Sequence, residues 1–161
     1  MALAVRIAGS EEAFAEVMNQ RAAQMGLTGT HFTNASGLHD PNHFSTCRDM
    51  ALLLQNALQN EVFYNVITAP EYRCAPNEFH EEGLYMQSTM FKYMESNVCG
   101  NGAVIMGGKT GTTNEAGYCL ASFAIYDGER YIMVTAMGPF NEEGIHVNIT
   151  DAVTAYGMLS H

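Results

Sequence analysis

One lysine stands among small residues, and its neighbours limit the chemistry it can do. The chain has only two lysines, and Lys109 lies in the run GGKTGTTNEAGYC over residues 107–119. An ammonium group attracts a carboxylate and biases nearby proton transfers, while threonine hydroxyls donate hydrogen bonds to the same anion. Glycines beside these groups let a ligand approach the backbone. The run is therefore a candidate anion-binding site.

The phosphate-binding loop G-x-x-x-x-G-K-[ST] is one interpretation of this run. Residues 103–110 (AVIMGGKT) match it except that Ala103 replaces the first glycine. A phosphate loop needs an open turn before the lysine and a helix directly after it. Here strand-forming residues 104–106 precede Lys109, and Gly111 follows it. The order of elements argues against nucleotide binding.

A second interpretation places Lys109, Thr110 and Gly111 on an exposed strand edge. An extended peptide can add to such an edge through main-chain hydrogen bonds. Lys109 and the hydroxyls of Thr110 and Thr112 would then hold its terminal carboxylate. A Gly/Thr-rich turn that merely joins two strands is equally compatible with the tripeptide alone.

Histidine and cysteine are poorly spaced for a metal site. His39 and His43 are separated by the turn-forming residues Asp-Pro-Asn, so we expect no helix to align their rings. The cysteines show neither C-x-x-C spacing nor the density of a disulfide scaffold. We therefore expect no metal or organic cofactor, and free thiols. The cysteines are Cys47, Cys74, Cys99 and Cys119.

Length and composition limit the number of domains and the classes of binding partner. The 161 residues suit a single domain. Seven Lys plus Arg against seventeen Asp plus Glu give a net charge of −10, which repels nucleic acid and anionic lipid. Residues 1–8 are too short, and interrupted by Arg6, for a signal peptide or a spanning helix. We expect no nucleic-acid partner, and no signal or anchor in this chain.

The first part of the chain is mainly helical by pattern. Apolar residues at helical spacing predict a helix capped by Ser10 and ended by Gly26, a second that begins at Ser45, and a third over residues 61–67. Residues 72–101 have only a weak pattern. Its apolar members are Met86, Met90, Phe91 and Met94.

The second part has the pattern of an antiparallel sheet. Residues 103–106 predict a short strand, and residues 118–126 and 130–137 bracket Asp127-Gly128, a strong hairpin signal. A last helix after Gly144 is expected to lie on the sheet. Its apolar face comprises Ile145, Ile149, Ala152, Val153, Tyr156 and Leu159.

Two parts of the sequence resemble one family. Residues 108–120 (GKTGTTNEAGYCL) resemble the K-T-G stretch of the serine-type D-Ala-D-Ala carboxypeptidases, the low-molecular-mass penicillin-binding proteins. Residues 18–27, 30–40 and 43–51 are similar to the helical region of that family, in the same order. The resemblance runs over residues 2–157, nearly the whole chain.

The resemblance implies an α+β fold, a partial penicillin-binding/β-lactamase-like fold. Residues 1–101 would form the helical region, and residues 102–161 the K-T-G strand, the hairpin and a C-terminal helix packed on the sheet. The chain would then be a single incomplete transpeptidase-like domain. In the family the helix of the nucleophile packs between the two regions, and early strands complete the sheet. We therefore expect exposed apolar surface, an unpaired edge and self-association.

The family mechanism is acyl transfer. A serine of S-x-x-K attacks the D-Ala-D-Ala peptide carbonyl, S-x-N relays the proton, and water releases the acyl-enzyme. By resemblance, Lys109 is catalytic, and Lys109 and Thr110 bind the carboxylate of the stem peptide or of a β-lactam. Gly111 and Thr112 complete the substrate-binding set, with the N–H of Thr112 as the candidate oxyanion donor. The parent enzyme would work outside the cytoplasmic membrane, in the membrane-associated cell envelope.

The sequence departs from the family at the nucleophile. Thr89 and Met106 stand three positions before the two lysines, so the chain contains no S-x-x-K, and S-x-N is also absent. Thr89-x-x-Lys92 follows the helical region instead of preceding it, which indicates coincidence. We expect the chain alone to be inactive. The alternatives are a non-catalytic peptidoglycan- or partner-binding module, or a β-lactamase relative, which residues 114–119 disfavour.

Overall fold

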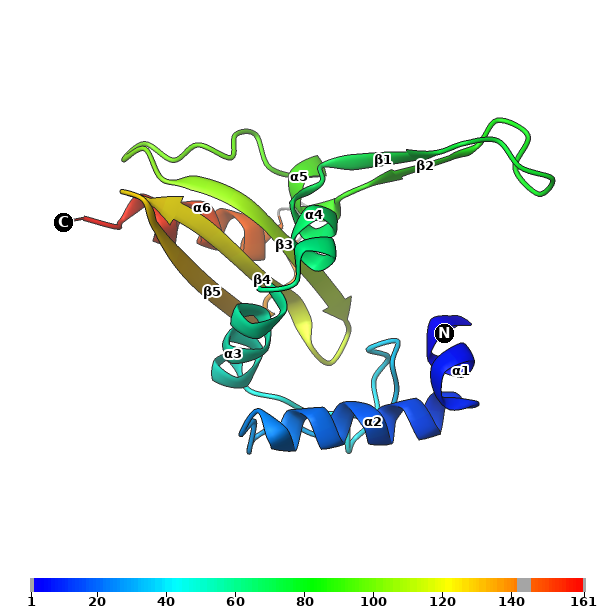
Figure 1. Ribbon diagram of the computed structural model, residues 1–161. Helices are drawn as coiled ribbons and strands as arrows, with labels where there is room; N and C mark the ends of the chain where they lie inside the picture. Colours follow the sequence, from blue (N-terminus) through cyan, green and yellow to red (C-terminus); the bar gives the residue numbers. More distant parts are fainter. Residues whose placement is uncertain (1, 142–145, 161) are drawn as a thin grey trace.

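An antiparallel sheet forms the centre of the molecule (Figure 1). The structure, a computed structural model, describes residues 2–141 and 146–160. The strands are β3 (Val104–Thr113), β4 (Gly117–Tyr126) and β5 (Glu129–Gly138), paired in the order β3-β4-β5. Asp127 and Gly128 join β4 to β5 with φ angles of 51° and 79°, the left-handed conformation that a two-residue hairpin turn requires. Among the described strands, β3 and β5 are the edges of this sheet.

Side chains that alternate along the strands fill two cores, one on each face of the sheet. Helix α6 (Val147–Gly157) covers one face, and the buried members of that core include Ile105, Leu120, Ala124, Ile149, Ala152 and Tyr156. Helices α3 (Cys47–Ala57) and α4 (Glu61–Thr68) cover the other face. Leu54 and Leu58 pack there against Phe123, with Tyr64, Ile67 and Ala121 at the margin. The predicted last helix does pack on the sheet.

Helices α1 (Ala2–Ala8) and α2 (Glu11–Gln24) form a lobe beside the sheet (Figure 1). The Oγ of Ser10 accepts a hydrogen bond from the N–H of Ala13 at 3.0 Å, and Gly26 follows α2 with φ 71°, so both predicted ends of this helix are confirmed. Asn19 fixes the following connection, because its carboxamide bonds both the N–H and the carbonyl of Phe32, at 2.7 and 2.8 Å.

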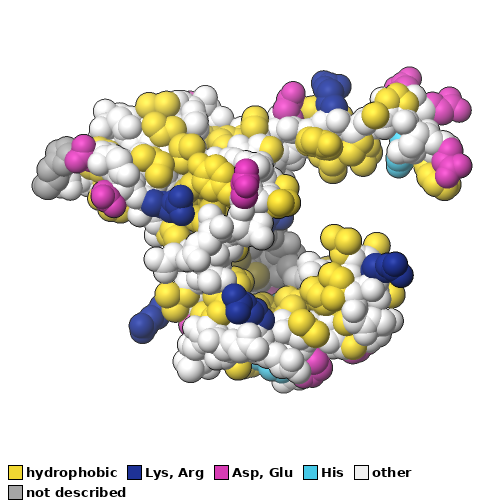
Figure 2. All heavy atoms as spheres, viewed as in Figure 1, with side chains coloured by type: hydrophobic (Ala, Val, Ile, Leu, Met, Phe, Trp, Pro, Cys, Tyr) yellow, Lys and Arg dark blue, Asp and Glu magenta, His cyan; other side chains and the backbone are white. Residues whose placement is uncertain are grey.

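Large apolar side chains remain on the outside of this arrangement. Leu3 and Ile7 of α1 are 77% and 66% exposed, and Val62 and Val66 of α4 are 73% and 70% exposed. Figure 2 shows hydrophobic surface on the lobe of α1 and α2 and on the projecting arm that residues 71–87 form. The expected exposed apolar surface is therefore present. Among the described residues, no helix combines the length and the apolar character that a bilayer span requires.

A hairpin lies in the region where the hydrophobic pattern of the sequence is weak. Strands β1 (Glu71–Cys74) and β2 (Leu84–Gln87) pair with each other and project away from the body (Figure 1), and α5 (Thr89–Lys92) follows. Met86 lies on β2 and is exposed, so it does not share one helical face with the other three apolar residues. Met90, Phe91 and Met94 do pack into the core beneath α6.

The N-cap of helix α3 lies one residue later than the predicted start at Ser45. Thr46, instead of Ser45, is its N-cap, and the Oγ1 of Thr46 accepts a hydrogen bond from the N–H of Asp49 at 3.0 Å. The hydroxyl of Ser45 instead lies 2.8 Å from the Oγ1 of Thr30. Both residue types cap helices well, and the contact with Thr30 explains which of them does so here.

The first strand of the sheet is longer than predicted. It continues from Met106 to Thr113, because the glycine-rich residues pair with β4 instead of forming a turn. The last helix begins at Val147. The predicted positions Gly144 and Ile145 lie outside the described residues.

A buried tyrosine hydroxyl makes stability depend on pH. Burial raises the pKa of Tyr156 from 10.0 to about 12, and its hydroxyl lies 3.1 Å from the Oγ of Ser122. Between these values the unfolded chain loses a proton that the native chain keeps, so the free energy of unfolding falls by about 2–3 kcal/mol as pH rises through this window. Urea unfolding should show Tyr156→Phe lacking this loss. Parallel pH curves for the two proteins would contradict the assignment.

Candidate substrate-binding site

The K-T-G residues lie on the edge strand β3. Lys109, Thr110, Gly111 and Thr112 pair with Ala121, Leu120, Cys119 and Tyr118 of β4. The strand order places β3 at the edge of the described sheet; its other side is bridged at Val104 by Val98, and no described strand is paired with that side at residues 109–112. The interpretation as a turn between two strands is therefore wrong. An exposed edge leaves main-chain groups that an extended peptide can bind.

Alternation along β3 decides which way the site faces. Lys109 shares a face with its partner Ala121, which packs beside the core under α3 and α4. Thr110 shares a face with Leu120, which is buried under α6. Lys109 is exposed, and its Nζ donates a hydrogen bond to the carbonyl of Thr110. The ammonium group is therefore held at the edge, on the side of the helical region.

The glycines around Lys109 have two different roles. A Cβ at Gly107 would lie 2.4 Å from the carbonyl oxygen of Ile67, and one at Gly108 would lie 2.8 Å from that of Ala121. These two glycines let α4 and β4 approach β3 closely. At Gly111, by contrast, the nearest atom to an added Cβ is the Cβ of Cys119 at 3.8 Å. Gly111 is therefore the glycine that leaves room for a ligand.

Hydrogen bonds fix the end of β3 beyond Thr112. The Oγ1 of Thr113 accepts from the N–H of Ala116 at 3.0 Å, and the N–H of Met137 donates to the carbonyl of Ala116 at 3.0 Å. Met137 has a φ of 60°, unusual for a residue other than glycine, at the bulge where β5 departs from regular pairing. The turn after the K-T-G residues is therefore clamped onto β5.

Asn148 is a supporting residue that sequence reasoning missed. Its side chain is 1% exposed on α6, and its Nδ2 donates to the carbonyl of Cys119 at 2.8 Å. Cys119 lies directly across from Gly111. Asn148 therefore anchors β4 behind the K-T-G strand. The only signal in the sequence was an asparagine one position before Ile149, on an otherwise apolar face.

The histidine pair is not arranged as a helical chelate. His39 and His43 lie in irregular backbone, and the Nδ1 of His43 is 3.2 Å from the N–H of Thr33. Burial lowers the pKa of His43, which favours the neutral ring as acceptor of that bond. Within residues 2–141 and 146–160, no three His, Cys, Asp or Glu side chains group closely enough to hold a metal.

Solved structures share this arrangement of helices and sheet. A D-alanyl-D-alanine carboxypeptidase from Mycobacterium tuberculosis H37Rv matches with a TM-score of 0.76 at 24% identity, over 98% of this chain and 57% of that one. The Streptomyces K15 DD-transpeptidase matches with a TM-score of 0.72 at 24% identity, over 90% of this chain and 53% of that one. The fold is that of the penicillin-binding proteins.

Sequence comparison narrows this class to one family. The family model of the D-alanyl-D-alanine carboxypeptidases, Peptidase_S11, matches residues 1–140, and the chain belongs to this family. It is 32% identical over 134 residues to DacF of Bacillus subtilis, covering 83% of this chain and 32% of that protein. It is 37% identical over 140 residues to DacC of Escherichia coli, covering 83% and 31%. The chain thus spans about a third of the length of these relatives.

Proposed function

We propose that this chain forms the K-T-G half of a serine D-Ala-D-Ala carboxypeptidase, which removes the terminal D-Ala from peptidoglycan stem peptides. The observation that carries the proposal is the exposed edge of β3, where Lys109 and the open Gly111 stand on a strand that pairs on one side only, with β4. Family membership supplies the reaction class. The place of action is the cell envelope, where this substrate lies.

The edge recognises the substrate by its C-terminus. The stem peptide extends along β3, and Lys109 and Thr110 bind its terminal carboxylate, or the carboxylate of a β-lactam. Lys109 also favours proton transfer from the attacking serine, which makes it the catalytic residue of this half. The N–H of Thr112 stabilises the oxyanion. A serine ester forms as the peptide C–N bond breaks, D-Ala leaves with the proton, and water hydrolyses the ester.

The nucleophile comes from another segment. These 161 residues contain neither S-x-x-K nor S-x-N, so they form an incomplete transpeptidase-like domain that does no acyl transfer by itself. The exposed apolar residues of α1 and α4 lie where further structure can pack, or where copies of the chain can associate.

A covalent label tests this assignment. The purified chain, incubated with a fluorescent penicillin, should show no mass increase by intact-mass spectrometry, because no activated serine is present to open the β-lactam. A full-length relative such as DacC serves as the positive control. An adduct on a serine or on Thr89 of this chain would show that the nucleophile has been misplaced.

A further inference from the structure

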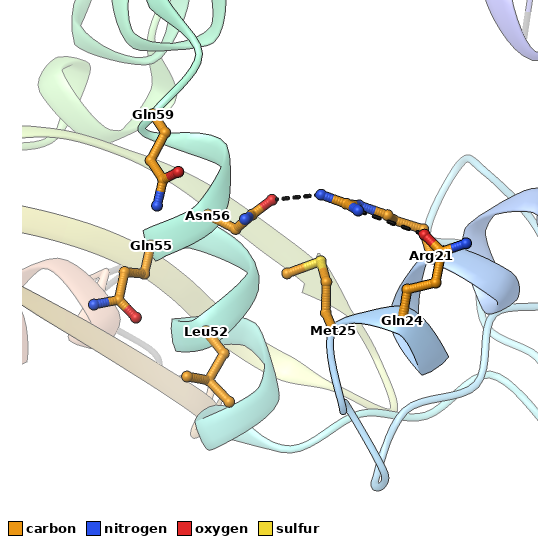
Figure 3. Close-up of a pocket in the computed structure, with 7 residues that line it drawn as sticks. All are labelled: Arg21, Gln24, Met25, Leu52, Gln55, Asn56 and Gln59. Atoms are coloured by element: carbon orange, nitrogen blue, oxygen red, sulfur yellow. Dashed lines mark hydrogen bonds between the residues drawn. The ribbon is translucent and has the colours of Figure 1, made fainter.

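A polar pocket lies between α2 and α3, and none of its lining residues belongs to β3 (Figure 3). Its volume is about 320 Å³, near the lower end of the roughly 300–1,000 Å³ of small-ligand sites. Residues at helical spacing build it from one side of each helix. They are Arg21, Gln24 and Met25 at the end of α2, Leu52, Gln55 and Asn56 of α3, and Gln59 just beyond α3.

The cation in this pocket is Arg21, which has no acidic partner among the residues that the structure describes. Arg21 reaches across from α2, where its Nη2 donates to the Oδ1 of Asn56 at 3.0 Å and its Nη1 to the Oε1 of Gln24 at 3.5 Å (Figure 3). Both acceptors are neutral amides. None of the seven lining residues is acidic, although the chain has seventeen acidic residues. The guanidinium is therefore held in place while donors remain for an anion.

Carboxamides dominate the rest of the lining. Gln24, Gln55, Asn56 and Gln59 each carry a donor and an acceptor, the same pair of groups that a peptide bond presents. Among the described residues, no hydrogen bond engages the side chains of Gln55 or Gln59. Free carboxamides suit a ligand that contains amide groups, which a simple inorganic anion lacks.

We propose that this pocket binds a short acidic peptide segment. A carboxylate of the peptide pairs with Arg21, its backbone amides bond to the carboxamides, and Leu52 supplies apolar contact. The proposal is independent of the function proposed for β3. Because the net charge of −10 repels anions at long range, recognition depends on the local contact with Arg21.

Two matched peptides test this site on the full chain. Calorimetric titration should show acetyl-Ala-Glu-Ala-amide binding at least about tenfold more tightly than acetyl-Ala-Gln-Ala-amide, because only the former offers a carboxylate for a charge-assisted bond. Arg21→Gln should abolish that preference. Arg6→Gln, which removes an exposed cation of α1, should preserve it.

Several outcomes would overturn the proposal. They are equal affinity of the two peptides for the unmodified chain, no saturable binding of either, or an Arg21→Gln variant that folds normally and keeps the preference. Loss of the preference in Lys109→Gln would move the peptide to β3 and reject the pocket. Competition by acetate as strong as by the acidic peptide would reject recognition of the amide groups.

Discussion

Lys109→Ala should slow D-Ala release by roughly 10²–10³-fold in a hybrid enzyme completed with the upstream segment of DacC, where the family carries S-x-x-K. The chain supplies β3 in this hybrid, and removing the ammonium group at its edge leaves the substrate carboxylate without its cation. Proton transfer from the serine also loses the nearby positive charge. The measurement is the rate of D-Ala release from a diacetyl-Lys-D-Ala-D-Ala peptide.

The other lysine of the chain provides the matched control. Lys92 is exposed on α5, with its Nζ 5.1 Å from the centre of the Tyr93 ring, so Lys92→Ala should leave the rate of the hybrid nearly unchanged. Thermal unfolding of each hybrid shows whether the variant is folded. Equal rates for Lys109→Ala and Lys92→Ala, or a folded hybrid that releases no D-Ala, would refute the assignment of the site.

Gly107→Ala should destabilise the chain by about 2–3 kcal/mol, because a well-packed site has no room for the added methyl group. The new Cβ would lie 2.4 Å from the carbonyl oxygen of Ile67, 2.9 Å from its carbonyl carbon and 3.2 Å from the Cα of Thr68. These are backbone atoms at the end of α4, so relief requires the helix to move away from β3. Urea unfolding gives the free energy.

A glycine with open space around it provides the control for the steric clash at Gly107. A Cβ added at Gly100 meets no heavy atom within 4 Å, and this residue lacks a positive φ, so Gly100→Ala should change stability by less than about 0.5 kcal/mol. Similar losses in the free energy of unfolding for both variants would contradict the close contact between α4 and β3.

Local sequence signals predicted the elements whose ends are set by local chemistry. Asp127-Gly128 specified the β4–β5 turn because its left-handed φ angles suit few residues, and Ser10 and Gly26 marked the ends of α2 by capping. These features depend on contacts between near neighbours in the chain. The residues before Lys109 predicted a strand only as far as Met106, and for Lys109 itself the sequence left a strand edge and a turn both open.

Features that depend on tertiary contact were not predictable in this way. The β1–β2 hairpin has no side buried against a core, so its sequence lacks the alternation that marks a half-buried strand. Asn148 acts through a carbonyl of β4 that is distant in sequence. The roles of Gly107 and Gly108 emerge only once α4 and β4 are placed beside them.

The order of strands bears on how this family can evolve. Because β3, β4 and β5 pair in the order in which they occur, the K-T-G edge and the sheet that supports it are encoded in one uninterrupted stretch, residues 104–138. A recombination event that transfers this stretch would carry the edge strand and both of its supporting strands together.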